Sequence, residues 1–172
     1  YRIPVKHAMA LFKFSKSGRV QHLLHQLKYR NHPEIGVTLG RIYGEKMKNE
    51  SELRTNVDLI IPIPLHPTRK RKRGYNQSAK FAEGLSEMLE VPFTDELLER
   101  RIKTETQTRK TKLSRWENIS GVFGLKEPAL LEGKKILLVD DVITTGSTLE
   151  ACSQVLIDQG CQQLNIACIA EA

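Results

Sequence analysis

The chain has 172 residues and a formal net charge of +7, with 40% hydrophobic and 27% charged residues. This length and composition are typical of one globular domain with a sizeable core. Its apolar runs fall well short of the roughly 20 residues of a membrane-spanning helix, and its first residues lack a signal-peptide pattern. We therefore expect a cytoplasmic protein without membrane insertion. Its positive charge indicates anionic partners, either phosphate-rich substrates or nucleic acid.

The first third of the chain predicts an edge strand followed by two helices. Residues 8–14 have the apolar content of a short strand, and residues 20–27 carry apolar side chains at helical spacing. A second helix is predicted at residues 35–49. Four of its apolar side chains are expected to face inward: Val37, Leu39, Ile42 and Met47.

The residue types that could bind a metal do not form a ligand pattern. His22 and His25 lie among Gln and Lys residues without a carboxylate at ligand spacing, so we expect a solvated face. The cysteines are odd in number, include no C-x-x-C pair and lie on or near apolar segments. They predict buried free thiols in a reducing compartment, with a metal site as the alternative. These cysteines are Cys152, Cys161 and Cys168.

A run of five consecutive cations, Arg69 to Arg73, follows the first predicted core strand at residues 57–63. Prolines between the two predict a stiff, non-helical loop, because proline cannot donate to a central ladder. Such a charge run is usually a solvated surface or a nucleic-acid patch. Here a helix capped by Asn76 or Ser78 follows it, which places the run at the ligand-binding edge of a sheet. We expect some of these cations to bind diphosphate and the outermost ones to remain solvated or available to DNA.

The last part of the chain predicts a polar loop and further strands. Residues 100–118 are rich in Lys and Arg and lack both periodicities, and a loop of that length is usually functional or disordered. A strand is expected near Phe123, and a last strand at residues 164–170 follows a helix that Gly160 ends. This order of strands and helices predicts an α/β fold with a mostly parallel sheet and right-handed crossovers.

The segment KKILLVDDVITTGSTL, residues 134–149, carries the strongest functional signal. Its apolar run at residues 136–139 is too short for a helix and predicts a buried parallel strand. Asp140 and Asp141 follow at the carboxyl end, where open α/β sheets bind ligands. Successive backbone N–H groups at the start of the next helix can then bind one anion, provided that one residue takes positive φ. The residues expected to hold that anion are Thr144, Thr145, Gly146, Ser147 and Thr148.

The two carboxylates restrict which anion fits. They would repel a phosphate unless they hold the hydroxyls of a sugar or a metal ion. A 5-phosphorylated ribose meets this condition, with its phosphate on the turn and its 2- and 3-hydroxyls on Asp140 and Asp141. The alternative is an ordinary strand-to-helix turn that Asp and Ser cap. The segment is neither a Walker loop nor a dinucleotide-binding fingerprint, because the glycine spacings of both are absent.

The stretch ILLVDDVITTGST resembles the phosphoribosyl pyrophosphate (PRPP) signature of type I phosphoribosyltransferases. Three further stretches make the chain similar to the ComF family, which includes ComFC-type and GntX-type proteins: Leu27-Lys28-Tyr29, PIPLHPTRKRKRGYNQ, and the T-x-x-Q and R-x-x-N-x-x-G-x-F elements that run from Thr104 to Phe123. The resemblance covers most of the chain. It implies a type I phosphoribosyltransferase fold in a single domain, residues 1–172, with a small N-terminal hood, residues 1–56, on a core, residues 57–172. A zinc ribbon usually precedes this domain in the family, whereas the sequence begins at Tyr1, so either the sequence is a fragment or this member lacks the ribbon.

The resemblance also implies roles for individual residues. Asp140 and Asp141 would be catalytic, and Thr144 to Thr148 would bind the 5-phosphate. Arg71, Arg73 and Gly74 would bind the diphosphate, and Mg²⁺ would arrive with PRPP, with Asp140 and Asp141 as the protein groups able to contact it. A flexible lid would close over the diphosphate with Gln107, Arg109, Lys110 and Arg115. The chain departs from many family members at Arg109-Lys110, where they have Gly-Leu.

Two functions are consistent with these observations. In the first, the protein is an enzyme that transfers or removes a phosphoribosyl group, with PRPP or a ribose 5-phosphate compound as substrate. In the second, it is a non-catalytic module of DNA uptake. That module would bind single-stranded DNA through Arg69 to Arg73 and Arg109 to Arg115, or sense PRPP, and it would work with a competence helicase. Fold and motif alone do not decide between them.

Overall fold

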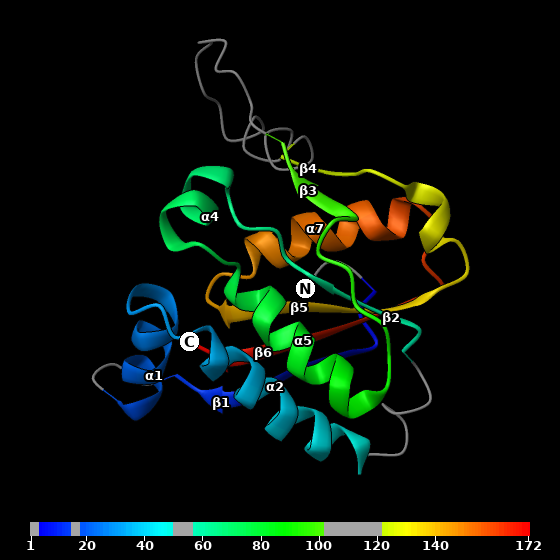
Figure 1. The fold of residues 1–172 in the computed structure, drawn as a ribbon. Coiled ribbons are helices and arrows are strands. Elements are labelled where there is room, and N and C mark those ends of the chain that lie inside the picture. The colour runs from blue at the N-terminus through cyan, green and yellow to red at the C-terminus, as the bar shows by residue number, and fades with distance from the viewer. Residues whose placement is uncertain (1–3, 15–17, 50–56, 102–121) are drawn as a thin grey trace.

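A four-stranded parallel sheet forms the centre of the structure, with its strands in the order β1-β6-β5-β2 (Figure 1). The computed structural model describes residues 4–14, 18–49, 57–101 and 122–172. The strands of this sheet are β1 (His7–Lys13), β2 (Leu59–Pro62), β5 (Lys135–Ile143) and β6 (Gln163–Glu171). Every pairing among them is parallel. The predicted mostly parallel sheet and the edge position of the first strand are therefore confirmed.

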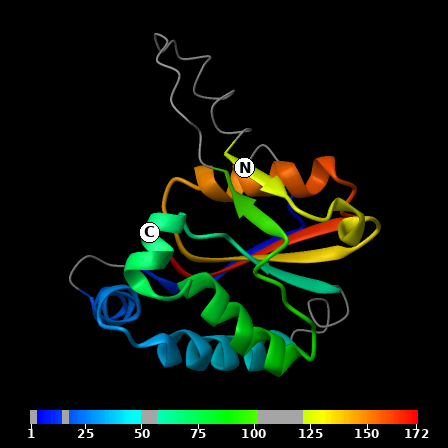
Figure 2. The ribbon, with the colours of Figure 1, turned by 45° about the horizontal axis from the view of Figure 1, so that its top comes forward.

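Helices cover both faces of the sheet (Figure 2). One face carries α1 (Arg19–Tyr29), α2 (Pro33–Lys48) and α5 (Gln77–Leu89). The other carries α7 (Ser147–Asp158), the short antiparallel pair β3 (Leu98–Arg100) and β4 (Phe123–Leu125), and the 3-10 helix η1 (Pro128–Leu131). A further short helix, α4 (Pro67–Arg73), connects β2 to α5. Among the helices in these parts of the chain, none is long and apolar enough to cross a bilayer.

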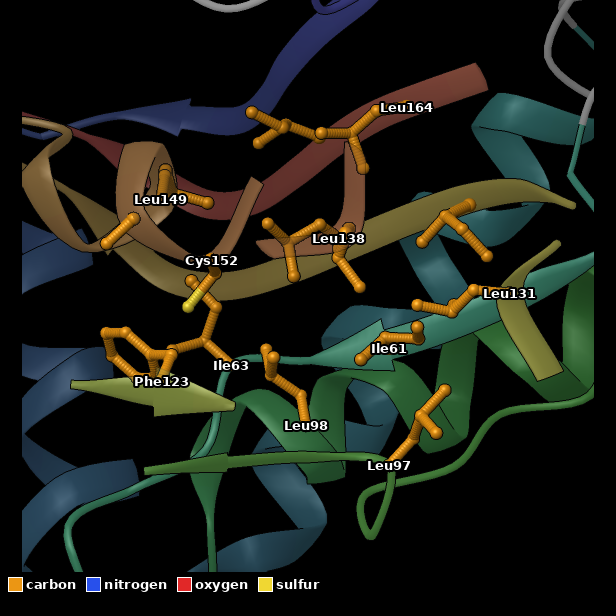
Figure 3. Close-up of a cluster of buried hydrophobic side chains, with 14 of the residues drawn as sticks. Ile61, Ile63, Leu97, Leu98, Phe123, Leu131, Leu138, Leu149, Cys152 and Leu164 are labelled. Carbon is orange, nitrogen blue, oxygen red and sulfur yellow. The ribbon is translucent and has the colours of Figure 1, made fainter. Parts of the chain in front are cut away.

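The core consists of two apolar clusters, one on each face of the sheet. Side chains of β5 alternate between them, because successive residues of a strand point to opposite faces. Leu137 and Val139 pack in the cluster beneath α2 and α5, and Ile136 and Leu138 pack in the cluster beneath α7. Figure 3 shows Leu138 in the second cluster, among side chains from α7, β2 and the β3–β4 pair. A strand buried on both faces explains the uninterrupted apolar run in the sequence.

Glycines bring α2 and α5 into close contact. The buried face of α2 holds three glycines four residues apart, and Gly84 of α5 meets the middle one. A Cβ on Gly40 would lie 2.8 Å from the Cα of Gly84, and a Cβ on Gly84 would lie 2.1 Å from the carbonyl oxygen of Val37. The expectation that Ile42 faces inward is wrong, since its side chain is 52% exposed. The glycine face turns Ile42 outward, and the buried residues of α2 are Gly36, Leu39, Gly40, Tyr43, Gly44 and Met47.

The substitution Gly84→Ala is expected to destabilise the fold. The added methyl group would overlap the backbone of α2, so the two helices would have to separate. Overpacking of this kind costs about 1 to 3 kcal/mol, which corresponds to a loss of about 3 to 10 °C in Tm for a chain of this size. Thermal unfolding followed by circular dichroism measures the change, with Thr38→Ala on the exposed face of α2 as the control. A Tm equal to that of the control would contradict the close helix contact.

Two elements differ from the sequence predictions. The cationic run, for which the sequence predicted no helix, forms α4, and the non-helical loop predicted from the prolines is confined to residues 63–66. Pro67 has the backbone angle required at the first helical position, the four cations of the last turn favour the negative end of the helix dipole, and Gly74 ends the helix at φ 84°. Strand β5 also continues through Asp140 and Asp141 to Ile143, because β6 pairs with it up to Glu171. On the β2 side the ladder ends earlier, at Pro62 opposite Val139.

Candidate functional site

The turn between β5 and α7 forms a small hollow, which we call the phosphate cradle and define as Thr144 to Thr148. Gly146 takes the positive φ of 74° that the sequence predicts, and α7 begins at the next residue. Gly146 has no side chain to cap the first turn of α7. The N–H of Ser147 makes only a long contact with Thr145 Oγ1, at 3.5 Å, so the start of α7 can still bind an anion. The hydroxyls of Thr145 and Ser147 lie 3.0 Å apart. The hollow is lined by Asp140, Val142, Ile143, the cradle residues and Leu149.

The volume of this hollow is about 40 Å³. That is room for a few water-sized atoms, which matches a single phosphate group. Because Asp140 lies on the wall of the same hollow, the structure places a carboxylate directly beside the cradle, as the sequence predicts.

Asp140 is held in place by two hydrogen bonds to the same oxygen. The hydroxyl of Ser78 donates to Oδ1 at 3.1 Å, and the backbone N–H of Asp141 donates to Oδ1 at 2.8 Å. Burial, together with the neighbouring charge of Asp141, raises the pKa of Asp140 to about 7, against the lowering effect of those bonds and of Lys28. A carboxylate with a raised pKa is a stronger hydrogen-bond acceptor, so Asp140 gains from a donor such as a sugar hydroxyl.

Ser78 reaches Asp140 because Asn76 fixes the start of α5. The Asn76 side chain accepts from the backbone N–H of Ser78 at 3.1 Å and donates to the carbonyl oxygen of Ile63 at 2.9 Å. Of the two predicted caps, Asn76 is therefore the residue that caps α5, which leaves the Ser78 hydroxyl for Asp140. No sequence pattern indicated this contact, because the two residues lie 62 positions apart.

Asp141 forms an ion pair with Lys28 from the last turn of α1. Lys28 Nζ lies 3.0 Å from Asp141 Oδ2, and the two side chains are only 23% and 17% exposed. Lys28 belongs to the Leu27-Lys28-Tyr29 element, from which the family resemblance implies no role for it. Its position in the site is a tertiary contact that joins the N-terminal region to the signature strand.

A second, larger hollow lies between the end of α1 and α4, and we call it the basic hollow. It has a volume of about 530 Å³ and is lined by Lys28, Tyr29, Asn31, Arg69, Arg71, Lys72, Arg73 and Gly74. The guanidinium carbon of Arg73 lies 5.5 Å from the centre of the Tyr29 ring, and that ring is 68% exposed. All residues predicted to bind diphosphate therefore line one hollow. Lys28 lies on its wall and also contacts Asp141, so the basic hollow adjoins the carboxylates.

The predicted lid residues, Gln107, Arg109, Lys110 and Arg115, lie outside the described residues. The described segments contain no group of three or more His, Cys, Asp or Glu side chains that could hold a metal ion. One oxygen of each carboxylate is already engaged by Ser78 or Lys28. Asp140 and Asp141 can thus offer Mg²⁺ only a partial set of ligands, and a phosphate-bearing ligand and water would have to supply the rest.

The three cysteines are free thiols, as predicted. Cys152 and Cys168 are buried and Cys161 is partly buried. Cys168 lies opposite Asp140 in the β5–β6 ladder. Burial, and then the charge of Asp140, raises the pKa of the Cys152 and Cys168 thiols, so both remain protonated and behave as small apolar side chains beneath the site.

Residues 75–172 match a family model described as phosphoribosyl transferase domain. This range contains the carboxylates, the cradle and Ser78. Among solved structures, the chain is similar to the glutamine PRPP amidotransferase from B. subtilis complexed with ADP and GMP, with a TM-score of 0.57, 17% identity, and coverage of 84% of this chain and 30% of that chain. That similarity shows the fold. Fold and family model together define a phosphoribosyltransferase domain.

Two curated relatives make the assignment more specific. Competence protein F from Haemophilus influenzae is 32% identical over 154 residues, which cover 87% of this chain and 67% of that protein. DNA utilization protein YhgH from Escherichia coli O157:H7 is 32% identical over 150 residues, which cover 86% of this chain. The chain belongs to the ComF family of phosphoribosyltransferase-domain proteins. It spans 65% of the length of the YhgH protein.

Proposed function

We propose that this chain binds PRPP and transfers or removes a phosphoribosyl group, with diphosphate as the leaving group, in a protein linked to competence and DNA uptake. The observation that carries the proposal is the shared hollow of Asp140 and the phosphate cradle. An anion site and a carboxylate that both face one small hollow suit a ligand with a phosphate at one end and hydroxyls near it. A 5-phosphorylated ribose has that arrangement.

Each part of PRPP then has a matching group. The cradle amides and hydroxyls, from Thr144 to Thr148, bind the 5-phosphate. Asp140 and Asp141 accept hydrogen bonds from the ribose hydroxyls. The basic hollow, with Arg71, Arg73 and Gly74 on its wall, binds the diphosphate.

The protein contributes position and charge to the reaction. As the bond between C1 and the diphosphate oxygen breaks, positive charge develops on the ribose and negative charge on the leaving group, and the nucleophile then bonds to C1. Asp140 and Asp141 lie on the side of the positive charge, and Arg71 and Arg73 on the side of the negative charge. Mg²⁺ bound to the diphosphate would neutralise part of the charge of the leaving group.

Introducing a carboxylate into the cradle tests this assignment. The variant Ser147→Asp keeps a residue that is favourable at a helix N-terminus, so α7 should stay folded. Because its negative charge would repel the 5-phosphate, we expect the affinity for ribose 5-phosphate to fall by about 100-fold, a cost of about 2.7 kcal/mol. Isothermal titration calorimetry measures this affinity.

Gln162→Glu adds the same charge just before β6, at the end of the β5–β6 pair opposite to the cradle. This control should bind ribose 5-phosphate like the wild type. If Ser147→Asp binds ribose 5-phosphate as tightly as this control, the cradle is not the phosphate site.

A second function, single-stranded DNA binding, is favoured by one specific observation. The exposed ring of Tyr29 lies among Lys28, Arg69, Lys72 and Arg73. An aromatic ring beside cations that can follow a phosphate backbone is the usual arrangement for binding single strands. A helicase of DNA uptake is the partner that this function would require.

The salt dependence of binding tests this second function. Replacing Arg69 and Lys72 by Gln should reduce the slope of log affinity against log salt concentration by about 1.4, since each phosphate contact on a single strand contributes about 0.7. Fluorescence anisotropy with an oligothymidylate measures the slope. Wild-type binding with no dependence on salt would exclude an electrostatic DNA site in the basic hollow.

A further inference from the structure

Lys28 lies where the two parts of the site meet. Its ammonium group is 3.0 Å from Asp141 Oδ2, and the same side chain lines the basic hollow. An exposed ion pair between two flexible side chains contributes little to stability. The Lys28–Asp141 pair is different, because both of its side chains are mostly shielded from water. The charge of Lys28 is therefore directed at the ribose carboxylates and at the hollow, with little screening.

The residues on both sides of Lys28 hold it in this position. The hydroxyl of Tyr75 donates to the carbonyl oxygen of Leu27, whose side chain is fully buried. The ring of Tyr29 lies under the guanidinium group of Arg73. These contacts fix the last turn of α1 against α4 and the segment that follows it. Lys28 is thus set between β5 and α4 by its neighbours and does not depend on the ion pair alone.

We propose that Lys28 is a positioning residue that bridges Asp141 to the diphosphate in the basic hollow, and this rests on the proposed function. An ammonium group has three N–H donors. One donor satisfies Asp141, and the others, which have no partner among the described residues, can bind a diphosphate oxygen on the hollow side. Lys28 then sets the distance between the ribose hydroxyls, which Asp141 holds, and the leaving group. It also places a cation where negative charge grows as the diphosphate leaves.

Comparing two ligands separates this role from a purely structural ion pair. Ribose 5-phosphate requires only the cradle and the carboxylates, whereas PRPP also requires the basic hollow. We expect Lys28→Met to weaken the binding of PRPP with Mg²⁺ by about tenfold or more, the usual loss for charge-assisted hydrogen bonds. Its affinity for ribose 5-phosphate should fall by a smaller factor, about threefold, because Lys28 also neutralises the neighbouring carboxylates. Lys28→Arg keeps the charge and should recover most of the PRPP affinity.

Lys48→Met is the matched control, because it breaks the Lys48–Glu90 ion pair, 3.1 Å long, between α2 and α5 away from the site. It should leave the affinities for both ligands unchanged. If Lys28→Met is not folded by circular dichroism, Lys28→Gln and Lys28→Arg carry the same comparison. Equal losses for both ligands, or no loss for PRPP, would overturn the role of Lys28. A wild type that binds neither ligand would instead overturn the proposed function itself.

Discussion

The double variant Asp140→Asn, Asp141→Asn is expected to lose PRPP binding while it keeps its fold. Asp140 lies on the wall of the cradle's hollow, and Asp141, the next residue of β5, is paired with Lys28. Amides are weaker acceptors than carboxylates, and a hydrogen bond to a charged group contributes about 1.5 to 3 kcal/mol. The loss of two such acceptors should reduce affinity by at least about 100-fold. Turnover that depends on PRPP should disappear with it.

A control variant with the same change in charge makes this result specific. Asp95 and Asp158 are both exposed, and Asp95→Asn, Asp158→Asn removes two carboxylates outside the site. Calorimetry should show wild-type affinity for the control and no measurable heat for the site variant, with both folded by circular dichroism. Equal affinity in the two variants would mean that the carboxylates do not bind the ligand.

The stability of the fold is expected to fall as the pH rises from 4 to 7, because of Asp140. Burial and the charge of Asp141 raise the pKa of Asp140 from 3.8 to about 7. Between these two values the folded chain keeps a proton that the unfolded chain has released, so stability falls as the pH rises from 4 to 7 and is constant above 7. The slope is about 1.4 kcal/mol per pH unit for one fully shifted group. We expect a total loss of about 2 to 4 kcal/mol, because Asp140 is only partly buried and shares its charge with a neighbour.

The substitution Asp140→Asn should remove the loss of stability between pH 4 and pH 7. The groups that face Asp140 are Asp141, Lys28, the Ser78 hydroxyl and the Cys152 and Cys168 thiols, and the two thiols stay neutral across this range. At pH 8 the variant should therefore unfold about 5 to 10 °C above the wild type, whereas at pH 4 the two should coincide. Scanning calorimetry at both pH values measures the difference. A constant difference at the two pH values would contradict the raised pKa.

The two predictions have opposite signs at Asp140: replacing it by Asn should stabilise the fold at neutral pH and weaken ligand binding. The substitution that removes a partly buried charge from the sheet also removes an acceptor that the ligand needs. Such a conflict is typical of a functional position, where a local cost to the fold is kept for the sake of the site.

Much of the site could be predicted because it is local in the sequence. The apolar run of β5, the two carboxylates and the turn at Gly146 lie within one short segment, so their order in the chain fixes their order in space. The positive φ of Gly146 and the start of α7 at Ser147 followed from the same segment. The parallel sheet was predictable from the alternation of strands and helices.

The contacts that complete the site could not be predicted in this way. Lys28 and Ser78 reach the carboxylates from α1 and α5, which lie far from β5 in the sequence, and no periodicity relates them. The helix α4 was missed because a run of like charges indicates a solvated surface rather than a helix, whereas Pro67 and Gly74 set its two ends. Ile42 was placed inward because apolar residues usually are, whereas glycines form the buried face of α2.

A crystal structure of the chain with ribose 5-phosphate would test the central claim most directly. We expect the phosphate within hydrogen-bond distance of the N–H groups of Gly146, Ser147 and Thr148, and the 2- and 3-hydroxyls on Asp140 and Asp141. The Ser78 contact with Asp140 should persist. A phosphate bound only in the basic hollow, with no sugar hydroxyl on either carboxylate, would contradict the account.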